Sequence, residues 1–167
     1  AYALDPVQKD IIKYSKKLFS PEDCLAFRES YQKTLTREII RSPAQIFVLS
    51  LEQLSSRLQD ISQIRMLHSL LDMENVDVYV VAYLRSQDEY LLSMYSTKVK
   101  VGIEERPFSI PEQGSPEWSR FDYASLLRMW GEVFGDSNII VRVFERDRLV
   151  NKDIIADFFA ALGREDC

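Results

Sequence analysis

The sequence predicts an α/β fold in which a parallel sheet is flanked by helices. Three apolar runs, residues 44–50, 76–84 and 138–144, have the length and the β-branched content of strands. Stretches with apolar residues at helical spacing separate these runs. Strands that alternate with helices pair in parallel through right-handed crossovers. We therefore expect a single α/β domain over residues 1–167.

The composition limits the classes of protein. The 167 residues are 46% hydrophobic and carry a net charge of -5, which disfavours a general nucleic-acid binder. No apolar run reaches the ~18 residues that cross a bilayer, so we expect no membrane span. Cys24 and Cys167 have neither metal-ligand spacing nor the pattern of a disulfide framework. We expect a cytoplasmic protein that uses no metal.

The first half of the chain predicts a helix, a strand and a second helix. Ser20 is a suitable N-cap, Pro21 suits the first helical position, and two acidic residues follow in the first turn. Residues 44–50, AQIFVLS, predict the first strand. The stretch from residue 51 to 71 then has leucine and isoleucine at helical spacing.

The second strand ends on an arginine. Residues 76–84, VDVYVVAYL, are apolar on both faces, which is typical of a central strand covered by helices. Arg85 follows, and Ser86 and Glu89 have the spacing of a capping box, so the next helix should begin directly after Arg85. Residues 102–120 are rich in proline and glycine and predict a loop, either a lid or binding loop or a mobile surface excursion.

The last third of the chain predicts a helix, a strand and a final helix. Asp122 should cap the first of these helices and Gly135 should end it. Residues 138–144 form the third predicted strand. Asn151 should cap the final helix and Gly163 should end it.

Arg85 has the position of an anion-binding residue. Ligands of open α/β sheets bind at the carboxyl ends of the strands, and a helix N-terminus there already favours anions. A guanidinium adds bidentate recognition of an oxyanion, and Ser93 adds a hydroxyl if its side of the helix faces the same pocket. The alternative is that Arg85 only forms a salt bridge with Asp88 or Glu89.

The segment VVAYLRSQDEYLLSMYS resembles the 3′-phosphate-binding segment of sulfotransferases that use 3′-phosphoadenosine 5′-phosphosulfate. Further on, FDYASLLRMWGEVFGDSNIIVRVFERDRL and IIADFFAALG resemble the later part of bacterial members of that family, and IFVLSLEQL resembles an earlier segment. The resemblance covers roughly residues 44–163, and the order of the motifs is more specific than any one motif.

The resemblance implies a three-layer sandwich like that of P-loop NTPases. It also implies that Arg85 and Ser93 bind the nucleotide 3′-phosphate. The reaction would be transfer of a sulfuryl group from 3′-phosphoadenosine 5′-phosphosulfate to a hydroxyl of a carbohydrate or glycoconjugate. Glu52, just past the first predicted strand, is the candidate base; the alternative is a first-turn helix carboxylate favoured by the helix dipole.

One part of the family pattern is missing from this chain. The first strand of the family and the glycine-containing loop that binds the 5′-phosphosulfate should precede all these segments, yet residues 1–19 contain neither a glycine nor an apolar strand. We therefore expect a shortened sulfotransferase domain whose sheet is completed by another polypeptide segment, and which binds the nucleotide weakly or not at all alone. The alternative function is a non-catalytic α/β interaction or assembly module. A nucleotide kinase is disfavoured by the same missing loop.

Overall fold

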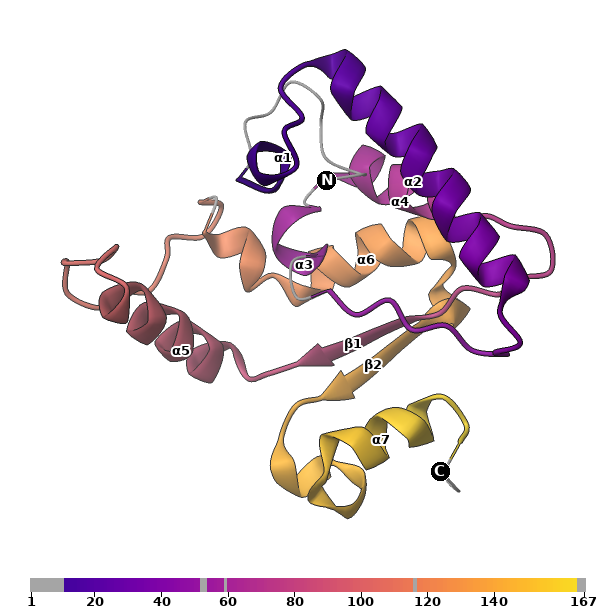
Figure 1. The fold of residues 1–167 in the computed structure, drawn as a ribbon. Coiled ribbons are helices and arrows are strands. Elements are labelled where there is room, and N and C mark those ends of the chain that lie inside the picture. Colours follow the sequence, from indigo (N-terminus) through magenta and orange to yellow (C-terminus); the bar gives the residue numbers. More distant parts are fainter. Residues whose placement is uncertain (1–10, 52–53, 59, 116, 165–167) are drawn as a thin grey trace. The chain divides into compact units, whose positions relative to one another are not determined.

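The chain divides into two compact units, Ala1–Val78 and Tyr79–Cys167. The computed structural model describes residues 11–51, 54–58, 60–115 and 117–164. In those residues the first unit is helical, and the second combines helices with a parallel sheet (Figure 1). The mixed α/β character that the sequence predicts is therefore confirmed.

The first unit starts with a well-capped helix. Its described helices are α1 (Ile11–Ser15), α2 (Pro21–Arg41), α3 (Leu54–Arg57) and α4 (Ile61–Leu71). The hydroxyl of Ser20 accepts a hydrogen bond from the Asp23 N–H at 3.1 Å, and the Asp23 carboxylate accepts one from the Ser20 N–H at 2.9 Å. This reciprocal capping box confirms Ser20 as the N-cap of α2.

Two expectations for the first unit are wrong. Residues 44–50 form no strand, and the side chains of Ile46 through Leu49 are exposed. A strand exists only where a neighbouring strand pairs with its backbone, and no described residue does so here. The helical stretch that follows is divided, because the Asp60 carboxylate accepts a hydrogen bond from the Ser62 N–H at 2.7 Å and starts α4 as a separate helix.

The second unit is built around two parallel strands. Strand β1 (Val80–Leu84) pairs with β2 (Ile139–Val143), and the register runs from Val80 opposite Ile139 to Leu84 opposite Val143. The described helices of this unit are α5 (Gln87–Lys100), α6 (Tyr123–Phe134) and α7 (Ile154–Ala161), with short 3₁₀ turns at Trp118–Arg120, Asp136–Asn138, Arg146–Arg148 and Val150–Lys152. The parallel pairing is as predicted, and β1 is shorter than the predicted strand.

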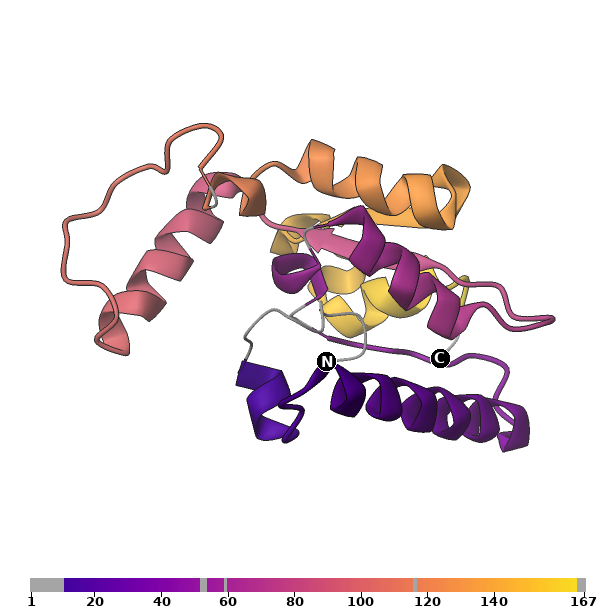
Figure 2. The ribbon, with the colours of Figure 1, turned by 90° about the horizontal axis from the view of Figure 1, so that it is seen from above.

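Helices cover both faces of this sheet. Figure 1 and Figure 2 both show α6 on one side of β1 and β2 and α7 on the other. Trp130 and Phe134 of α6 are buried, and their rings stack with centroids 5.6 Å apart. Helix α5 instead projects away from the sheet in both views, with Leu91 as its one buried residue among those described.

The ends of the helices test the predicted caps. The Asp122 carboxylate accepts a hydrogen bond from the Ser125 N–H at 3.0 Å, and Gly135 ends α6 with a φ of 87°, both as predicted. The predicted cap of α7 is wrong, because Asp153 caps this helix. Asn151 has a left-handed φ of 53° inside the preceding turn, so the helix can only start beyond it.

Helix α5 begins directly after Arg85 and Ser86, as the sequence predicts. The predicted capping box is not formed, because the Ser86 side chain makes no capping hydrogen bond. The described residues from 102 to 117 contain neither helix nor strand, which confirms the predicted loop.

Candidate functional site

Arg85 lies at the carboxyl edge of the β1–β2 pair. The Phe144 N–H, just past β2, donates a hydrogen bond to the Leu84 carbonyl at 2.8 Å, so the two strands remain paired up to Arg85. The Cζ atom of Arg85 then lies 5.3 Å from the centroid of the Phe144 ring, a cation–π distance. The end of β2 therefore positions the guanidinium immediately ahead of the N-terminus of α5.

The ion pair of Arg85 leaves hydrogen-bonding capacity unused. Its Nε lies 3.5 Å from Oε2 of Glu89, and the two side chains are 40% and 63% exposed. The salt bridge to Glu89 that the sequence allows is therefore present, although an exposed pair of this length contributes little. The Nε atom is shielded from solvent and has no hydrogen-bond partner among the described residues.

Ser93 lies two turns into α5 and is exposed. Arg85, Glu89 and Ser93 are four residues apart, so Glu89 and Ser93 lie one above the other on α5 and Arg85 continues that stripe toward its N-terminus. We call these three residues the α5 stripe. Whether Arg85 and Ser93 face one pocket stays a prediction.

The proline-rich loop is attached to a different side of α5. Tyr90 packs on Phe121 with ring centroids 5.3 Å apart, and the Tyr95 hydroxyl donates to the Arg106 carbonyl at 2.9 Å. The Ile103 N–H donates a hydrogen bond to the Lys98 carbonyl at 2.9 Å. Since each helical residue turns about 100° around the axis, Tyr95 lies about a third of a turn or more from Glu89 and Ser93, whereas Tyr90 lies only about 60° from Ser93. Glu89 and Ser93 are both exposed, so the loop does not cover them.

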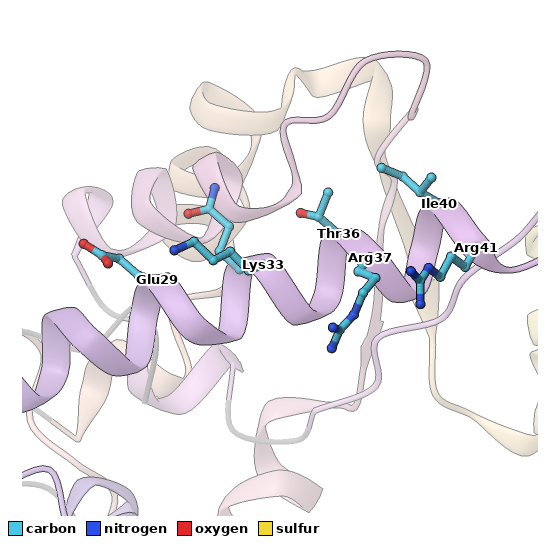
Figure 3. Close-up of a pocket in the computed structure, with 7 residues that line it drawn as sticks. Glu29, Lys33, Thr36, Arg37, Ile40 and Arg41 are labelled. Atoms are coloured by element: carbon cyan, nitrogen blue, oxygen red, sulfur yellow. The ribbon is translucent and has the colours of Figure 1, made fainter.

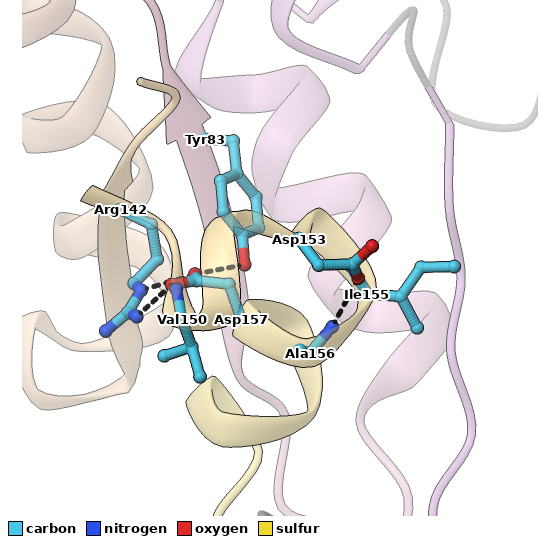
Figure 4. A network of polar contacts seen from close by, with 7 residues as sticks. All are labelled: Tyr83, Arg142, Val150, Asp153, Ile155, Ala156 and Asp157. Carbon is cyan, nitrogen blue, oxygen red and sulfur yellow. Dashed lines mark hydrogen bonds and ion pairs between the residues drawn. The ribbon is translucent and has the colours of Figure 1, made fainter. Parts of the chain in front are cut away.

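A polar network that the sequence analysis missed joins β1, β2 and α7 (Figure 4). The carboxylate of Asp157, only 1% exposed, accepts hydrogen bonds from the Tyr83 hydroxyl at 2.7 Å and from Nε of Arg142 at 2.8 Å. It also accepts one from the Val150 N–H at 3.0 Å. The sequence contains one sign of this network. Asp157 is the single acid in the otherwise apolar run IIADFFAAL, and a carboxylate buried in such a helix requires partners.

This network shifts the pKa values of Asp157 and Tyr83. The Arg142 guanidinium holds the pKa of Asp157 well below its usual 3.8, and the Val150 N–H and the Tyr83 hydroxyl add to that effect against the opposing effect of burial. Burial raises the pKa of Tyr83 to about 12, and its hydrogen bond to Asp157 adds to the rise. Both carboxylate oxygens of Asp157 have partners within the protein, so we interpret the network as structural.

Two more acidic residues lie near predicted strand ends. Glu145, after β2, pairs with Arg148 at 2.7 Å, and Arg142 is bound to Asp157. Glu52, the candidate base, lies outside the described residues. Within the described ranges, no group of three or more histidine, cysteine, aspartate or glutamate residues could hold a metal ion.

A groove on the first unit runs along α2 (Figure 3). Its described lining comes from this helix alone: Glu29, Gln32, Lys33, Thr36, Arg37, Ile40 and Arg41. Lys33, Arg37 and Arg41 are exposed and four residues apart, so they form a row of positive charge. Such a row on one helix is typical of a solvated face and brings together no catalytic groups.

Comparison with known proteins gives one partial similarity. An uncharacterized protein of Archaeoglobus fulgidus is 37% identical over 84 residues, which are 50% of this chain and 22% of that protein. The chain thus spans 22% of the length of the curated relative it matches. No family model matches the chain, and no solved structure does. None of the helices described here is long and apolar enough to cross a membrane.

Proposed function

We propose that this chain is part of a sulfotransferase that uses 3′-phosphoadenosine 5′-phosphosulfate, and that Arg85 and Ser93 of the α5 stripe bind the nucleotide 3′-phosphate. The observation that carries the proposal is the position of Arg85. It lies at the carboxyl end of a parallel strand, directly before a helix N-terminus, and its side chain is 40% exposed. This arrangement agrees with the resemblance of residues 80–96 to the 3′-phosphate-binding segment of that family.

The local chemistry suits a phosphate group. The dipole of α5 favours an anion at its start, and a guanidinium can bind two phosphate oxygens at once. The contact with Phe144 limits the freedom of Arg85, which reduces the entropy lost when a ligand binds. Ser93, exposed on the same stripe, offers a hydroxyl donor at the far end of the site.

The reaction would be an in-line transfer. An acceptor hydroxyl oxygen attacks the sulfur, the bond from sulfur to the bridging phosphate oxygen breaks, and adenosine 3′,5′-bisphosphate leaves. The hydroxyl proton passes to a base, for which Glu52 is our candidate. We assign the acceptor to a carbohydrate or glycoconjugate on the resemblance alone.

The other half of the nucleotide site needs further residues. A backbone cradle for the phosphosulfate requires glycine in a tight loop, and the first glycine of this chain is Gly102, beyond α5. We propose that another polypeptide segment supplies this loop. The observation that favours the alternative, a non-catalytic interaction module, is the small two-stranded sheet, which leaves strand edges free for a protein partner.

The proposal is tested by titrating the isotope-labelled chain with millimolar adenosine 3′,5′-bisphosphate and following its amide NMR signals. We expect shifts at the start of α5 and at Ser93, and we expect Arg85→Ala to remove them. Arg128→Ala is the matched control, because it removes the same charge from an exposed position on α6. Equal responses of the two variants, or shifts confined to other elements, would contradict the proposed site.

A further inference from the structure

Three contacts hold the segment before α6 against one face of α5. The side-chain amide of Gln87 donates a hydrogen bond to the Phe121 carbonyl, and the centroid of the Tyr90 ring lies 5.3 Å from that of Phe121. The Arg120 guanidinium lies 3.7 Å from the sulfur of Met94. Gln87, Tyr90 and Met94 are three and four residues apart, so they share one face of the helix. The start of α6 is therefore fixed beside the start of α5 by contacts that all lie within the second unit.

Tyr123 is the first residue of α6 and lies within electrostatic reach of Arg85. Partial burial raises the pKa of its phenol, the nearby Tyr90 adds to the rise, and the Arg85 guanidinium opposes it. The Tyr123 hydroxyl has no hydrogen-bond partner among the described residues, whereas the hydroxyls of Tyr83 and Tyr95 both have acceptors. Because a half-buried tyrosine hydroxyl normally bonds to some group, this one is available to a ligand.

The start of α6 can offer this side chain to an anion more readily than its backbone. The Asp122 carboxylate already accepts a hydrogen bond from the Ser125 N–H at 3.0 Å. A carboxylate in that position also repels an anion that approaches the backbone. The Tyr123 hydroxyl is neutral and can donate to a phosphate oxygen.

We propose that Tyr123 is a further ligand-binding residue, whose hydroxyl donates a hydrogen bond to the same phosphate group that Arg85 binds. This inference rests on the proposed function, because it adds one contact to the proposed 3′-phosphate site. Arg85 supplies the charge from the end of β1, and Tyr123 supplies a neutral donor from a second element. A phosphate monoester has several acceptor oxygens and can bond to both, so the pair favours a 3′-phosphate over a free 3′-hydroxyl.

The test compares Tyr123→Phe with the unaltered chain in NMR titrations with adenosine 3′,5′-bisphosphate and with adenosine 5′-monophosphate. The substitution removes the hydroxyl and keeps the ring. We expect the Kd for the bisphosphate to rise about three- to tenfold, because a hydrogen bond to a charged group is lost. The Kd for the monophosphate should stay the same, because that ligand has no 3′-phosphate. An unchanged Kd for the bisphosphate, or equal losses for both nucleotides, would overturn the inference.

Two controls separate direct binding from a structural role. Tyr95→Phe removes a hydroxyl that bonds to the Arg106 carbonyl in the loop, and it should leave both Kd values unchanged. The Nε–H signal of Arg85 in the ligand-free protein should be the same with and without the Tyr123 hydroxyl. A shift of that signal would show that Tyr123 only holds Arg85 in place, and would overturn direct binding.

The response of Arg85→Ala distinguishes failure of this inference from failure of the proposed function. If Arg85→Ala loses the response to the bisphosphate while Tyr123→Phe binds as tightly as the unaltered chain, the 3′-phosphate site stands and the role of Tyr123 is wrong. If Arg85→Ala binds as tightly as the unaltered chain, both proposals are wrong, because the two residues are assigned to one phosphate.

Discussion

Asp157 is held by hydrogen bonds from both strands and from the turn before α7. Its side chain is buried. A buried carboxylate is tolerated only when its charge is compensated, and here Arg142 provides the compensation. We infer that this residue fixes α7 against the sheet.

We expect Asp157→Ala to lower the free energy of unfolding by about 3–5 kcal/mol, because it leaves the Arg142 charge without its buried partner. Asp147→Ala is the matched control. Asp147 is 79% exposed and pairs with Lys152 at 2.7 Å, and loss of such a surface pair costs about 0–1 kcal/mol. Chemical denaturation of both variants measures the difference. Similar losses would show that the Asp157 network is not specially stabilising.

The same network predicts a dependence on pH. The pKa of Asp157 is lowered in the folded protein, so its contribution is complete above the unfolded value of 3.8 and is lost as the pH falls toward the folded value. Asp23, Asp60 and Asp122 also have lowered pKa values, because backbone or side-chain groups of nearby serines bond to them. We therefore compare Asp157→Asn with the unaltered chain, and expect a shallower loss of stability in acid for the variant. Parallel curves would contradict the assignment.

At the scale of elements, the local sequence predicts where helices begin and end better than it predicts which strands pair. The caps Ser20 and Asp122 and the end at Gly135 were predictable, because a cap acts within a few residues of its own helix. The capping box at Ser86 and the cap at Asn151 were predicted wrongly. The absence of a strand at residues 44–50 was not predictable, since a strand needs a partner that its own residues do not encode. Asp157 was missed for a similar reason, because its partners lie on other elements.

Helix α5 and the loop after it form one local structure. The Tyr95 ring packs on Phe108 with centroids 5.3 Å apart, and its hydroxyl bonds to the Arg106 carbonyl. We expect Tyr95→Ala to speed cleavage after Glu105 by a glutamate-specific protease, because both attachments are lost. Tyr95→Phe keeps the ring contact and should have a smaller effect.

Nucleotide binding by a loop variant tests whether this loop covers the nucleotide or lies away from it. The loop is attached away from the α5 stripe, so Tyr95→Phe should leave the NMR response to adenosine 3′,5′-bisphosphate unchanged. A loss of that response would show that the loop covers the nucleotide after all.

At the scale of the whole molecule, the chain carries one half of a proposed nucleotide site. Arg85 and Ser93 suit the 3′-phosphate, whereas the sequence before Gly102 contains no glycine with which to build a phosphosulfate loop. A parallel sheet with helices on both faces was predictable from the order of apolar runs. The number of strands was not, because it depends on segments that pair across the sheet.

We expect this chain to contact only the 3′-phosphate of the nucleotide, and therefore to bind the nucleotide weakly. Calorimetric titration with adenosine 3′,5′-bisphosphate, with adenosine 5′-monophosphate as the matched ligand, tests it most directly. We predict a Kd for the bisphosphate of about 1 mM or weaker, which corresponds to about -4 kcal/mol, and a further loss when the 3′-phosphate is absent. Micromolar binding of the bisphosphate, or equal binding of both nucleotides, would contradict the account.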